Sequence, residues 1–317
     1  CKTKLCRVCN STIIDNEREL PTFPSQLSSD LVEDLLVNVD AFIFDADGVL
    51  WLGNTPIPGS PEFIKYLLSK VWLLSYLWSI SGSKFFAVLA VAEKCLSFVN
   101  GGDVVNPAAI VSDLIKKNQL LRNKSVYLIG SEGLRSELKK AGVDCFGSGP
   151  DPMHDKDFDD DKRDVGAVIV GFEKYFNYVK MIKAANYLQN EDCLFFGTNE
   201  DETSPGPYPN TVIPDTGPIL TAVKSASGRQ PLVVGKPHAP AFEYISRRWN
   251  LKPDRTFMVG DRLNTDICFG KRNGLKTLLV LSGCHTLSEL SLFRESGNVD
   301  MVPDFYATSL GSLVGFS

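Results

Sequence analysis

Short apolar segments alternate with amphipathic ones along most of this chain, and the alternation predicts strands and helices in turn. Residues Ala41–Phe44 (AFIF) form an apolar run of the kind found in strands buried on both faces. The segment 61–68 begins with a proline and carries apolar residues at helical spacing. Repeated strand–helix units of this kind indicate an α/β fold, a doubly wound parallel sheet with a Rossmann-like core.

The same patterns predict the remaining elements. Further strands are expected at 71–78, 125–129, 165–170, 193–197, 232–234, 256–259 and 276–281. Further helices are expected at 31–39, 108–117, 132–141, 178–188, 219–227, 239–249 and 264–270. Residues 1–30 carry no apolar period and predict a loose arm, whereas 203–218 hold five prolines and two glycines and predict a long functional loop.

Polar side chains follow three of the predicted strands directly. Asp45 and Asp47 end the first strand, Lys236 follows the strand at 232–234, and Asp261 follows the strand at 256–259. Each has an ordinary alternative: an acidic turn, a surface lysine and a helix N-cap. Carboxyl ends of parallel strands meet at one edge of a sheet, where ligands bind. Together the acids could hold Mg²⁺ and the lysine could offset the charge of a phosphate, leaving one aspartate to attack phosphorus.

The segment Val71–Ala92 departs from the pattern, because its 22 residues contain a single charge, Lys84. Its length and polarity would suit a membrane span on hydropathy alone. Gly82 and several serines interrupt it, however, and it lies inside an α/β pattern. We therefore favour a buried strand followed by a helix over a membrane-attached protein. A third reading is that residues 71–99 are foreign to the fold, such as translated intron.

Composition and charge narrow the function further. The chain has 317 residues, 44% of them hydrophobic and 22% charged, which suits a globular protein of two domains. Its net charge of −5 and lack of a basic block exclude nucleic acid as the expected partner. The cysteines lie mostly singly, and the pair Cys6 and Cys9 has no second pair at zinc-site spacing. A reducing, cytoplasmic location is expected.

Three stretches resemble motifs of a known family. FDADGVLW (44–51), GKPHAP (235–240) and FMVGDRLNTD (257–266) look like motifs one, three and four of the haloacid dehalogenase superfamily. Within it, the chain most resembles the phosphoglycolate, pyridoxal and para-nitrophenyl phosphatase group. The stretches TNEDETSPGP (198–207), ASGRQPLVVGKP (226–237) and VPDFY (302–306) extend that likeness beyond the catalytic motifs.

The resemblance implies a Mg²⁺-dependent phosphatase that acts on a small phosphorylated metabolite through an aspartyl-phosphate. Asp45 would be the nucleophile and a metal ligand. Asp47 would protonate the leaving alcohol and then deprotonate water, with its backbone carbonyl on the metal. Lys236 would screen the nucleophile and the phosphate from one another.

The resemblance also assigns the remaining site residues. Asp261 would be the third metal contact, and Asp266 would orient the metal site through hydrogen bonds. Gly48 and Ser79 would contribute to substrate binding.

The family fold implies a core interrupted by an inserted α/β cap. The expected division is a flexible arm (1–37), the first part of the core (38–120), the cap (121–230) and the second part of the core (231–317). We also expect a homodimer that forms through the cap.

The chain departs from the family pattern at motif two. The family has Ser/Thr-Asn-Asn there, whereas this position falls near Trp78–Ile80 and no Asn-Asn occurs between Val71 and Ser97. Loss of one hydrogen-bond donor to the charge that develops in the transition state can lower the rate by on the order of 10²–10³-fold. An alternative is therefore a catalytically impaired relative that binds a phosphorylated ligand or partner without efficient turnover.

The cap sequence bears on the substrate. The pyridoxal phosphatase branch has a histidine where this chain has Thr198–Asp201. The three histidines that the chain does contain, His154, His238 and His285, are interpreted as ordinary surface or loop residues. The absence of a histidine at this position favours 2-phosphoglycolate as the substrate.

Overall fold

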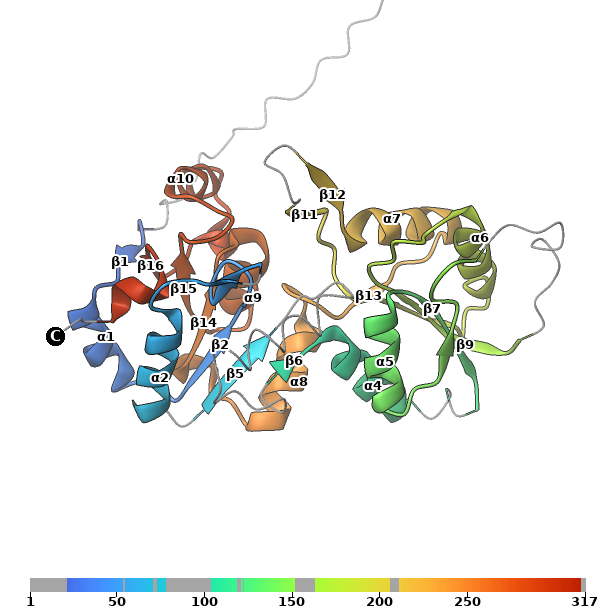
Figure 1. Ribbon diagram of the computed structural model, residues 1–317, viewed down its shortest axis with the longest axis horizontal. Helices are drawn as coiled ribbons and strands as arrows, with labels where there is room; N and C mark the ends of the chain where they lie inside the picture. The colour runs from blue at the N-terminus through green and yellow to red at the C-terminus, as the bar shows by residue number, and fades with distance from the viewer. Residues whose placement is uncertain are drawn as a thin grey trace, which may run out of the picture.

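Two lobes, each a parallel sheet covered by helices, lie side by side in the computed structural model of the protein (Figure 1). It describes residues 22–53, 55–70, 73–77, 104–118, 121, 123–151, 163–205 and 211–314. We call the lobe built on the seven-stranded sheet the core lobe and the one built on the five-stranded sheet the cap lobe.

The core lobe confirms the predicted doubly wound sheet. Its strand order is β1-β16-β15-β14-β2-β5-β6, and every neighbouring pair is parallel. In that order the strands are Ser25–Gln26, Phe305–Ala307, Lys276–Val280, Thr256–Gly260, Ala41–Phe44, Leu73–Leu77 and Val104–Val105. The central position of β2 explains its uninterrupted apolar sequence, since helices cover both faces of this sheet.

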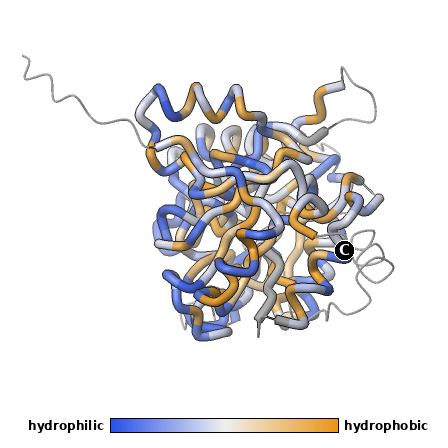
Figure 2. Tube along the Cα trace, turned by 90° about the vertical axis from the view of Figure 1, so that its left-hand side faces the viewer, coloured by the Kyte–Doolittle hydropathy of each residue, from blue (hydrophilic) through white to orange (hydrophobic). Residues whose placement is uncertain are grey.

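Successive side chains of β2 enter different apolar clusters. Phe42 and Phe44 pack on one face with α1 (Ser29–Leu36) and α2 (Ser60–Lys70). Ile43, between them, packs on the other face. The helices that contribute to the opposite face are α4 (Pro107–Lys117), α8 (Ala239–Trp249) and α9 (Cys268–Arg272). Figure 2 shows hydrophobic and hydrophilic residues interspersed along the chain.

The cap lobe has the strand order β13-β10-β9-β7-β8, again with parallel neighbours. In that order its strands are Leu232–Val233, Leu194–Gly197, Val165–Val170, Ser125–Ile129 and Cys145–Phe146. Its helices are α5 (Glu132–Lys140), α6 (Tyr178–Tyr187) and α7 (Thr216–Ser227). Because β13 belongs to this sheet, the cap lobe extends a few residues beyond 230, where the sequence placed its end.

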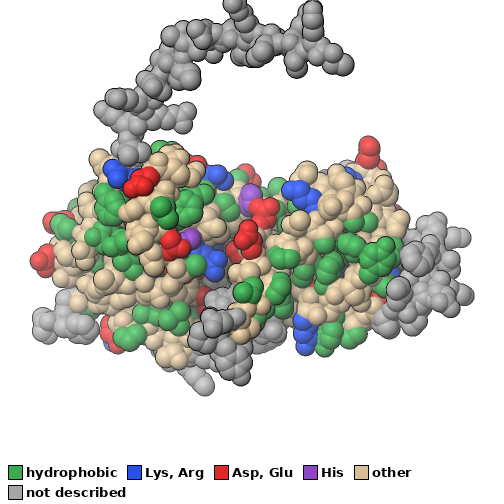
Figure 3. Space-filling model, turned by 90° about the horizontal axis from the view of Figure 1, so that it is seen from above, with side chains coloured by type: hydrophobic (Ala, Val, Ile, Leu, Met, Phe, Trp, Pro, Cys, Tyr) green, Lys and Arg blue, Asp and Glu red, His purple; other side chains and the backbone are tan. Residues whose placement is uncertain are grey.

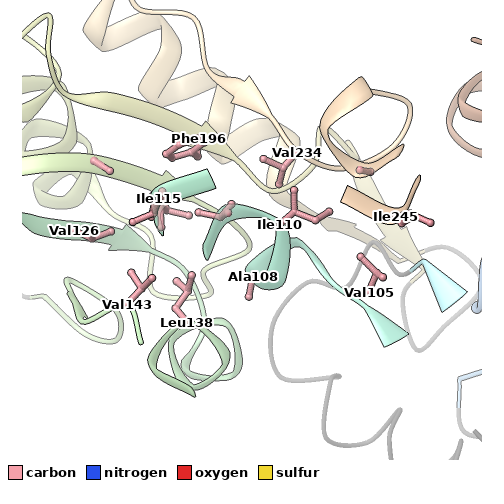
Figure 4. Packing of buried hydrophobic residues seen from close by; sticks show 14 of the residues in the cluster. Val105, Ala108, Ile110, Ile115, Val126, Leu138, Val143, Phe196, Val234 and Ile245 are labelled. Carbon is pink, nitrogen blue, oxygen red and sulfur yellow. The ribbon is translucent and has the colours of Figure 1, made fainter. Parts of the chain in front are cut away.

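A single apolar cluster joins the two lobes through α4. Ile110 and Ile115 of this helix pack in one cluster with Val126 of the cap sheet and Ile245 of the core helix α8 (Figure 4). The helix begins where predicted, since Asn106 accepts a hydrogen bond from the Ala109 N–H and Pro107 occupies its first turn. The position of α4 therefore couples the cap lobe to the sheet that carries the candidate site.

The predicted flexible arm over 1–37 needs correction. Residues 25–26 form β1, which adds a parallel edge strand to β16, and Leu27 and Val32 are buried in the core. The helix predicted at 31–39 is confirmed as α1, preceded by Ser28 as N-cap residue. A two-residue strand has too few positions to show a period, which is why the sequence pattern missed it.

The predicted loop at 203–218 also contains regular structure. Thr203–Pro205 (β11) and Val212–Pro214 (β12) pair as an antiparallel hairpin, and α7 begins at Thr216. A second hairpin joins β3 (Trp51–Leu52) to β4 (Thr55–Pro56). A further helix that the sequence did not predict, α10 (Leu287–Glu295), starts with a capping box between Thr286 and Glu289.

The strand predicted at 71–78 is confirmed as β5, which lies beside β2. Residues 78–103, and with them Ser79 and most of the unusual apolar segment, lie outside the described residues. Within the part of the chain that the structure describes, no helix is long and apolar enough to cross a membrane.

The apolar cluster that joins the two lobes predicts how much stability is lost when one of its side chains is shortened. Ile110 is 1% exposed, so Ile110→Ala should lower the free energy of unfolding by about 2–5 kcal/mol, as for other buried isoleucines, and Ile110→Val by only about 0.5–1.5 kcal/mol. Urea unfolding at equilibrium measures both. An alanine variant as stable as the valine variant would contradict tight packing between the lobes.

Candidate catalytic and metal site

Asp45 lies at the carboxyl end of β2, where a backbone hydrogen bond to the neighbouring strand fixes its position. Its N–H donates to the Val259 carbonyl at 2.9 Å, extending the pairing between β2 and β14. The chain then turns sharply at Gly48, whose φ of +84° is a conformation that favours glycine. A Cβ on Gly48 would also lie 2.4 Å from Asp261 Oδ2. Glycine is thus required for the first carboxylate loop to approach the second.

Asp261 follows β14 directly, and a π-helical turn over Leu263–Ile267 brings Asp266 back beside it. The turn places Asp266 so close to the strand that a Cβ on Gly260 would lie 2.1 Å from the Asp266 Cβ. Insertions of this type are frequent at functional sites. Here the π-helical turn explains how the carboxylates of Asp261 and Asp266, five positions apart in the sequence, lie close together.

Lys236 reaches the site from the loop after β13. Its Nζ donates to Asp45 Oδ1 and to Asp266 Oδ1, both at 2.6 Å, and the side chain is buried. Three segments that are distant in sequence thus meet around one ammonium group. Asp45 and Asp261 lie at the ends of neighbouring strands of one sheet, as expected, whereas Lys236 follows β13, which belongs to the cap sheet and not to the sheet that the prediction assumed.

Three carboxylates form a group suited to a cation. Asp45, Asp261 and Asp266 each offer an oxygen, and these atoms lie within 4.8 Å of one another. Asp261 Oδ2 accepts the Cys284 N–H at 2.7 Å, whereas the buried Asp261 Oδ1 has no hydrogen-bond partner within the described chain. An unpaired buried carboxylate oxygen is costly, so a hard, oxygen-binding cation fits this position.

The two oxygens of Asp266 are already engaged. Oδ1 accepts from Lys236 and Oδ2 accepts the Arg262 N–H at 3.0 Å. This arrangement fits the expected role of Asp266, which is to orient the metal site. Asp45 and Asp261 are the better placed direct ligands.

Asp47 is not part of this carboxylate group. Its side chain is exposed, whereas that of Asp266 is buried. This position is compatible with contact to a metal through the backbone carbonyl only, as the resemblance implied. Its exposed carboxyl group lies at the surface of the site, where a substrate alcohol or water can approach it.

Burial controls the protonation of the site. Burial, together with the carboxylates of Asp266 and Asp261, raises the pKa of Asp45 above its ordinary value even though Lys236 opposes this. Burial, with Asp266 nearby, raises the pKa of Asp261 to about 7. Burial alone would lower the pKa of Lys236, but the Asp266 and Asp45 carboxylates raise it. The lysine therefore stays protonated, and the excess negative charge favours a cation.

The loop Ser282–His285, which follows β15, also borders the site. Ser282 Oγ donates to the Gly48 carbonyl at 2.7 Å, so it ties this loop to the nucleophile loop. A Cβ on Gly283 would lie 2.1 Å from Asp261 Oδ2. These residues were not predicted as site residues, although they directly follow a predicted strand, as Asp45 and Asp261 do. Their position directly after a strand is the signal that could have found them.

Two histidines have more specific contacts than the sequence suggested. His238 Nε2 lies 2.8 Å from Glu200 Oε2, which joins the Lys236 loop to the cap loop Thr198–Asp201. His285 is half-buried and accepts a backbone hydrogen bond, so it is not an ordinary surface residue. The third, His154, lies outside the described residues. Figure 3 shows charged side chains of both signs and histidines gathered between the two lobes.

Two family models match the chain. The model described as haloacid dehalogenase-like hydrolase matches residues 42–144, and the one described as HAD-hydrolase-like matches residues 233–313. Between them they contain all the residues of the carboxylate–lysine group.

Several relatives align with most of this chain. The putative NipSnap protein K02D10.1 of Caenorhabditis elegans is 41% identical over 83% of this chain, which spans about half (52%) of that protein. The glycerol-3-phosphate phosphatase of Mus musculus is 37% identical over 91% of this chain and 94% of its own. The chronophin of Bos taurus is 35% identical over 89% of this chain and 95% of its own.

Solved structures share the fold. The p-nitrophenyl phosphatase from Archaeoglobus fulgidus superposes with a TM-score of 0.73 at 26% identity, covering 87% of this chain and 98% of its own. The glycerol phosphate phosphatase Rv1692 from Mycobacterium tuberculosis, in complex with magnesium, gives 0.71 at 23% identity, covering 92% and 79%. The predicted resemblance is confirmed: this chain belongs to the haloacid dehalogenase-like hydrolases.

Proposed function

We propose that this protein is a Mg²⁺-dependent phosphatase of small phosphomonoesters that works through an aspartyl-phosphate at Asp45. The observation that carries the proposal is the buried Lys236 paired with Asp45, beside an unpaired Asp261 oxygen. The names of the relatives and of the solved neighbours support it, since they include phosphatases and one magnesium complex. The chemistry then follows from the positions of these residues.

In the first step a carboxylate oxygen of Asp45 attacks phosphorus, and the bond from phosphorus to the substrate alcohol breaks. Asp47 donates a proton to the departing alkoxide, so a neutral alcohol leaves. Lys236 offsets the charge that Asp45 and the phosphoryl oxygens bring together. Asp45 and Asp261, oriented by Asp266, would hold Mg²⁺, which supplies charge neutralisation of the phosphoryl oxygens when bound.

In the second step water attacks the phosphorus of the aspartyl-phosphate. Asp47, now a carboxylate, takes a proton from that water. The bond between phosphorus and the Asp45 oxygen breaks, which regenerates the Asp45 carboxylate and releases inorganic phosphate. One carboxyl group acts as the acid in the first step and as the base in the second, which fits its exposed position beside the largely buried Asp45.

We infer 2-phosphoglycolate as the first substrate to test, because the loop Thr198–Asp201 lacks a histidine. A second candidate is glycerol 3-phosphate. The acids Glu200–Glu202 lie on the cap loop that contacts the Lys236 loop, and they would repel a substrate carboxylate more than a neutral glycerol group. The name of the Mus musculus relative supports the same candidate.

The direct test is a comparison of kcat/KM for 2-phosphoglycolate, glycerol 3-phosphate, pyridoxal 5′-phosphate and p-nitrophenyl phosphate with and without Mg²⁺. Mg²⁺-dependent release of phosphate supports the proposal, and the ranking of the first two decides the substrate. Binding of these compounds with no turnover would instead support the impaired relative suggested by the missing Asn-Asn sequence.

Replacing either aspartate of the first loop should separate their roles. Asp45→Asn should lower kcat by at least on the order of 10³-fold with the fold retained, because an amide cannot form the acyl-phosphate. Asp47→Asn should lower kcat by roughly 10²–10⁴-fold yet leave Mg²⁺ affinity nearly unchanged, since its side chain lies outside the carboxylate group. Circular dichroism checks folding. Equal loss of Mg²⁺ affinity in both variants would refute this division.

Mg²⁺ binding should depend on pH through Asp261. The folded pKa of about 7 lies above the ordinary 3.8, so the metal-free protein binds an extra proton between these values and loses stability as pH rises through 7. Mg²⁺ must displace that proton. Its Kd should therefore fall by about fivefold from pH 6 to pH 7 and by about tenfold from pH 6 to pH 8, where it levels off.

Calorimetric titration and thermal melting can check this dependence. Mg²⁺ should raise the Tm more at about pH 8 than at about pH 6, while Asp261→Asn should show weak binding at both values. A Kd that does not change across the range would show that protonation of Asp261 does not compete with the cation.

A further inference from the structure

The loop Ser282–His285 holds Asp261 and the π-helical turn Leu263–Ile267, which carries Asp266. The Cys284 N–H donates to Asp261 Oδ2 at 2.7 Å, and the His285 N–H donates to the Asp261 carbonyl at 3.1 Å. These two bonds fix both the side chain and the backbone of Asp261. The His285 side chain adds a third contact to the same turn.

His285 Nδ1 accepts the Leu263 N–H at 2.9 Å. Leu263 is the first residue of the π-helical turn Leu263–Ile267, and N–H groups at the start of a helical turn have no partner within it. The preceding N–H, that of Arg262, is satisfied by Asp266 Oδ2. The first two donors of the turn are therefore satisfied by one site carboxylate and by one histidine.

The environment of the imidazole suits a fixed acceptor. The ring is half-buried and lies edge-on to Phe293 of α10, with centroids 6.0 Å apart and planes at 79°. His285 can accept a hydrogen bond at Nδ1 only when its imidazole is neutral and carries its proton on Nε2. The residue thus contributes hydrogen bonding to the turn without adding charge beside the carboxylates.

We propose that His285 is a positioning residue that sets the geometry of the cation site by accepting the Leu263 N–H. Without this acceptor the turn can shift, and Asp261 and Asp266 shift with it. This inference rests on the proposed Mg²⁺ function. Loss of a group that orients metal ligands typically weakens metal binding roughly 10–100-fold.

Four variants of the full chain distinguish the effect of the hydrogen-bond acceptor at position 285 from that of the ring contact with Phe293. Asn Oδ1 lies the same number of bonds from the backbone as His Nδ1, so His285→Asn should keep the acceptor and bind Mg²⁺ within about threefold of the unmodified protein. His285→Leu removes the acceptor and should weaken binding by about tenfold or more. His285→Gln carries its acceptor one bond farther out and takes the place of the leucine variant if that one does not fold. Phe293→Leu removes only the ring contact and should bind normally.

Isothermal titration calorimetry with MgCl₂ gives the affinities, and thermal melting without metal shows whether each variant is folded. A merely structural role would lower the Tm of His285→Leu with no change in Mg²⁺ affinity, and that result would overturn the inference. Equal weakening in His285→Asn and His285→Leu would overturn it as well. An unmodified protein that binds no Mg²⁺ would instead refute the proposed function, a failure that is distinguishable from the other two.

Discussion

The buried ammonium group of Lys236 is the constraint on which the site depends. It donates to Asp45 and Asp266 at 2.6 Å each, and those residues come from two separate strand ends. Removing one lysine and two carboxylates from water is costly unless the charges are paired in good geometry. The pairing leaves a net negative charge, which Asp261 increases. The close approach of three chain segments depends on this one arrangement. Burial and the mutual proximity of the carboxylates raise the pKa values of Asp45 and Asp261, although the lysine opposes that rise.

The cap lobe contains a comparable buried pair that has a different consequence. Lys180 Nζ lies 3.4 Å from Glu173 Oε2 and also donates to the Gly147 carbonyl. Glu173 in turn accepts the Gly149 N–H at 3.1 Å. These groups satisfy the backbone of one loop, and the other Glu173 oxygen, Oε1, accepts the Tyr175 N–H at 3.0 Å. Asp261 Oδ1, by contrast, has no hydrogen-bond partner among the residues that the structure describes, which distinguishes the candidate cation site from a structural ion pair.

Much of the fold and part of the site could be predicted from the sequence, because they depend on local periodicity. The apolar run Ala41–Phe44 predicted a strand buried on both faces, and β2 lies within the seven-stranded sheet. The acids directly after β2 and β14 were predicted to converge, since parallel strands end at one edge. Lys236 reaches them from the end of β13 in the cap sheet, which this argument does not explain. The short strand β1 and the hairpin β11–β12 were missed, because two or three residues show no period.

Contacts between distant segments could not be predicted in this way. Nothing in the local sequence indicates that His285 accepts a bond from Leu263, or that His238 meets Glu200 across the two lobes. Both depend on how loops from different strands pack. The exposed position of Asp47, one residue from buried neighbours, likewise follows from the turn at Gly48 rather than from composition.

The central claim is that phosphate passes through a covalent bond to Asp45, and chemical trapping tests it most directly. Borohydride reduces an acyl-phosphate to an alcohol, so quenching the enzyme during turnover should convert the side chain at position 45 to that of homoserine. Peptide mass spectrometry locates the change. We expect homoserine at position 45 only, dependent on both substrate and Mg²⁺. Trapping at another carboxylate, or rapid turnover with no trapped residue, would contradict it.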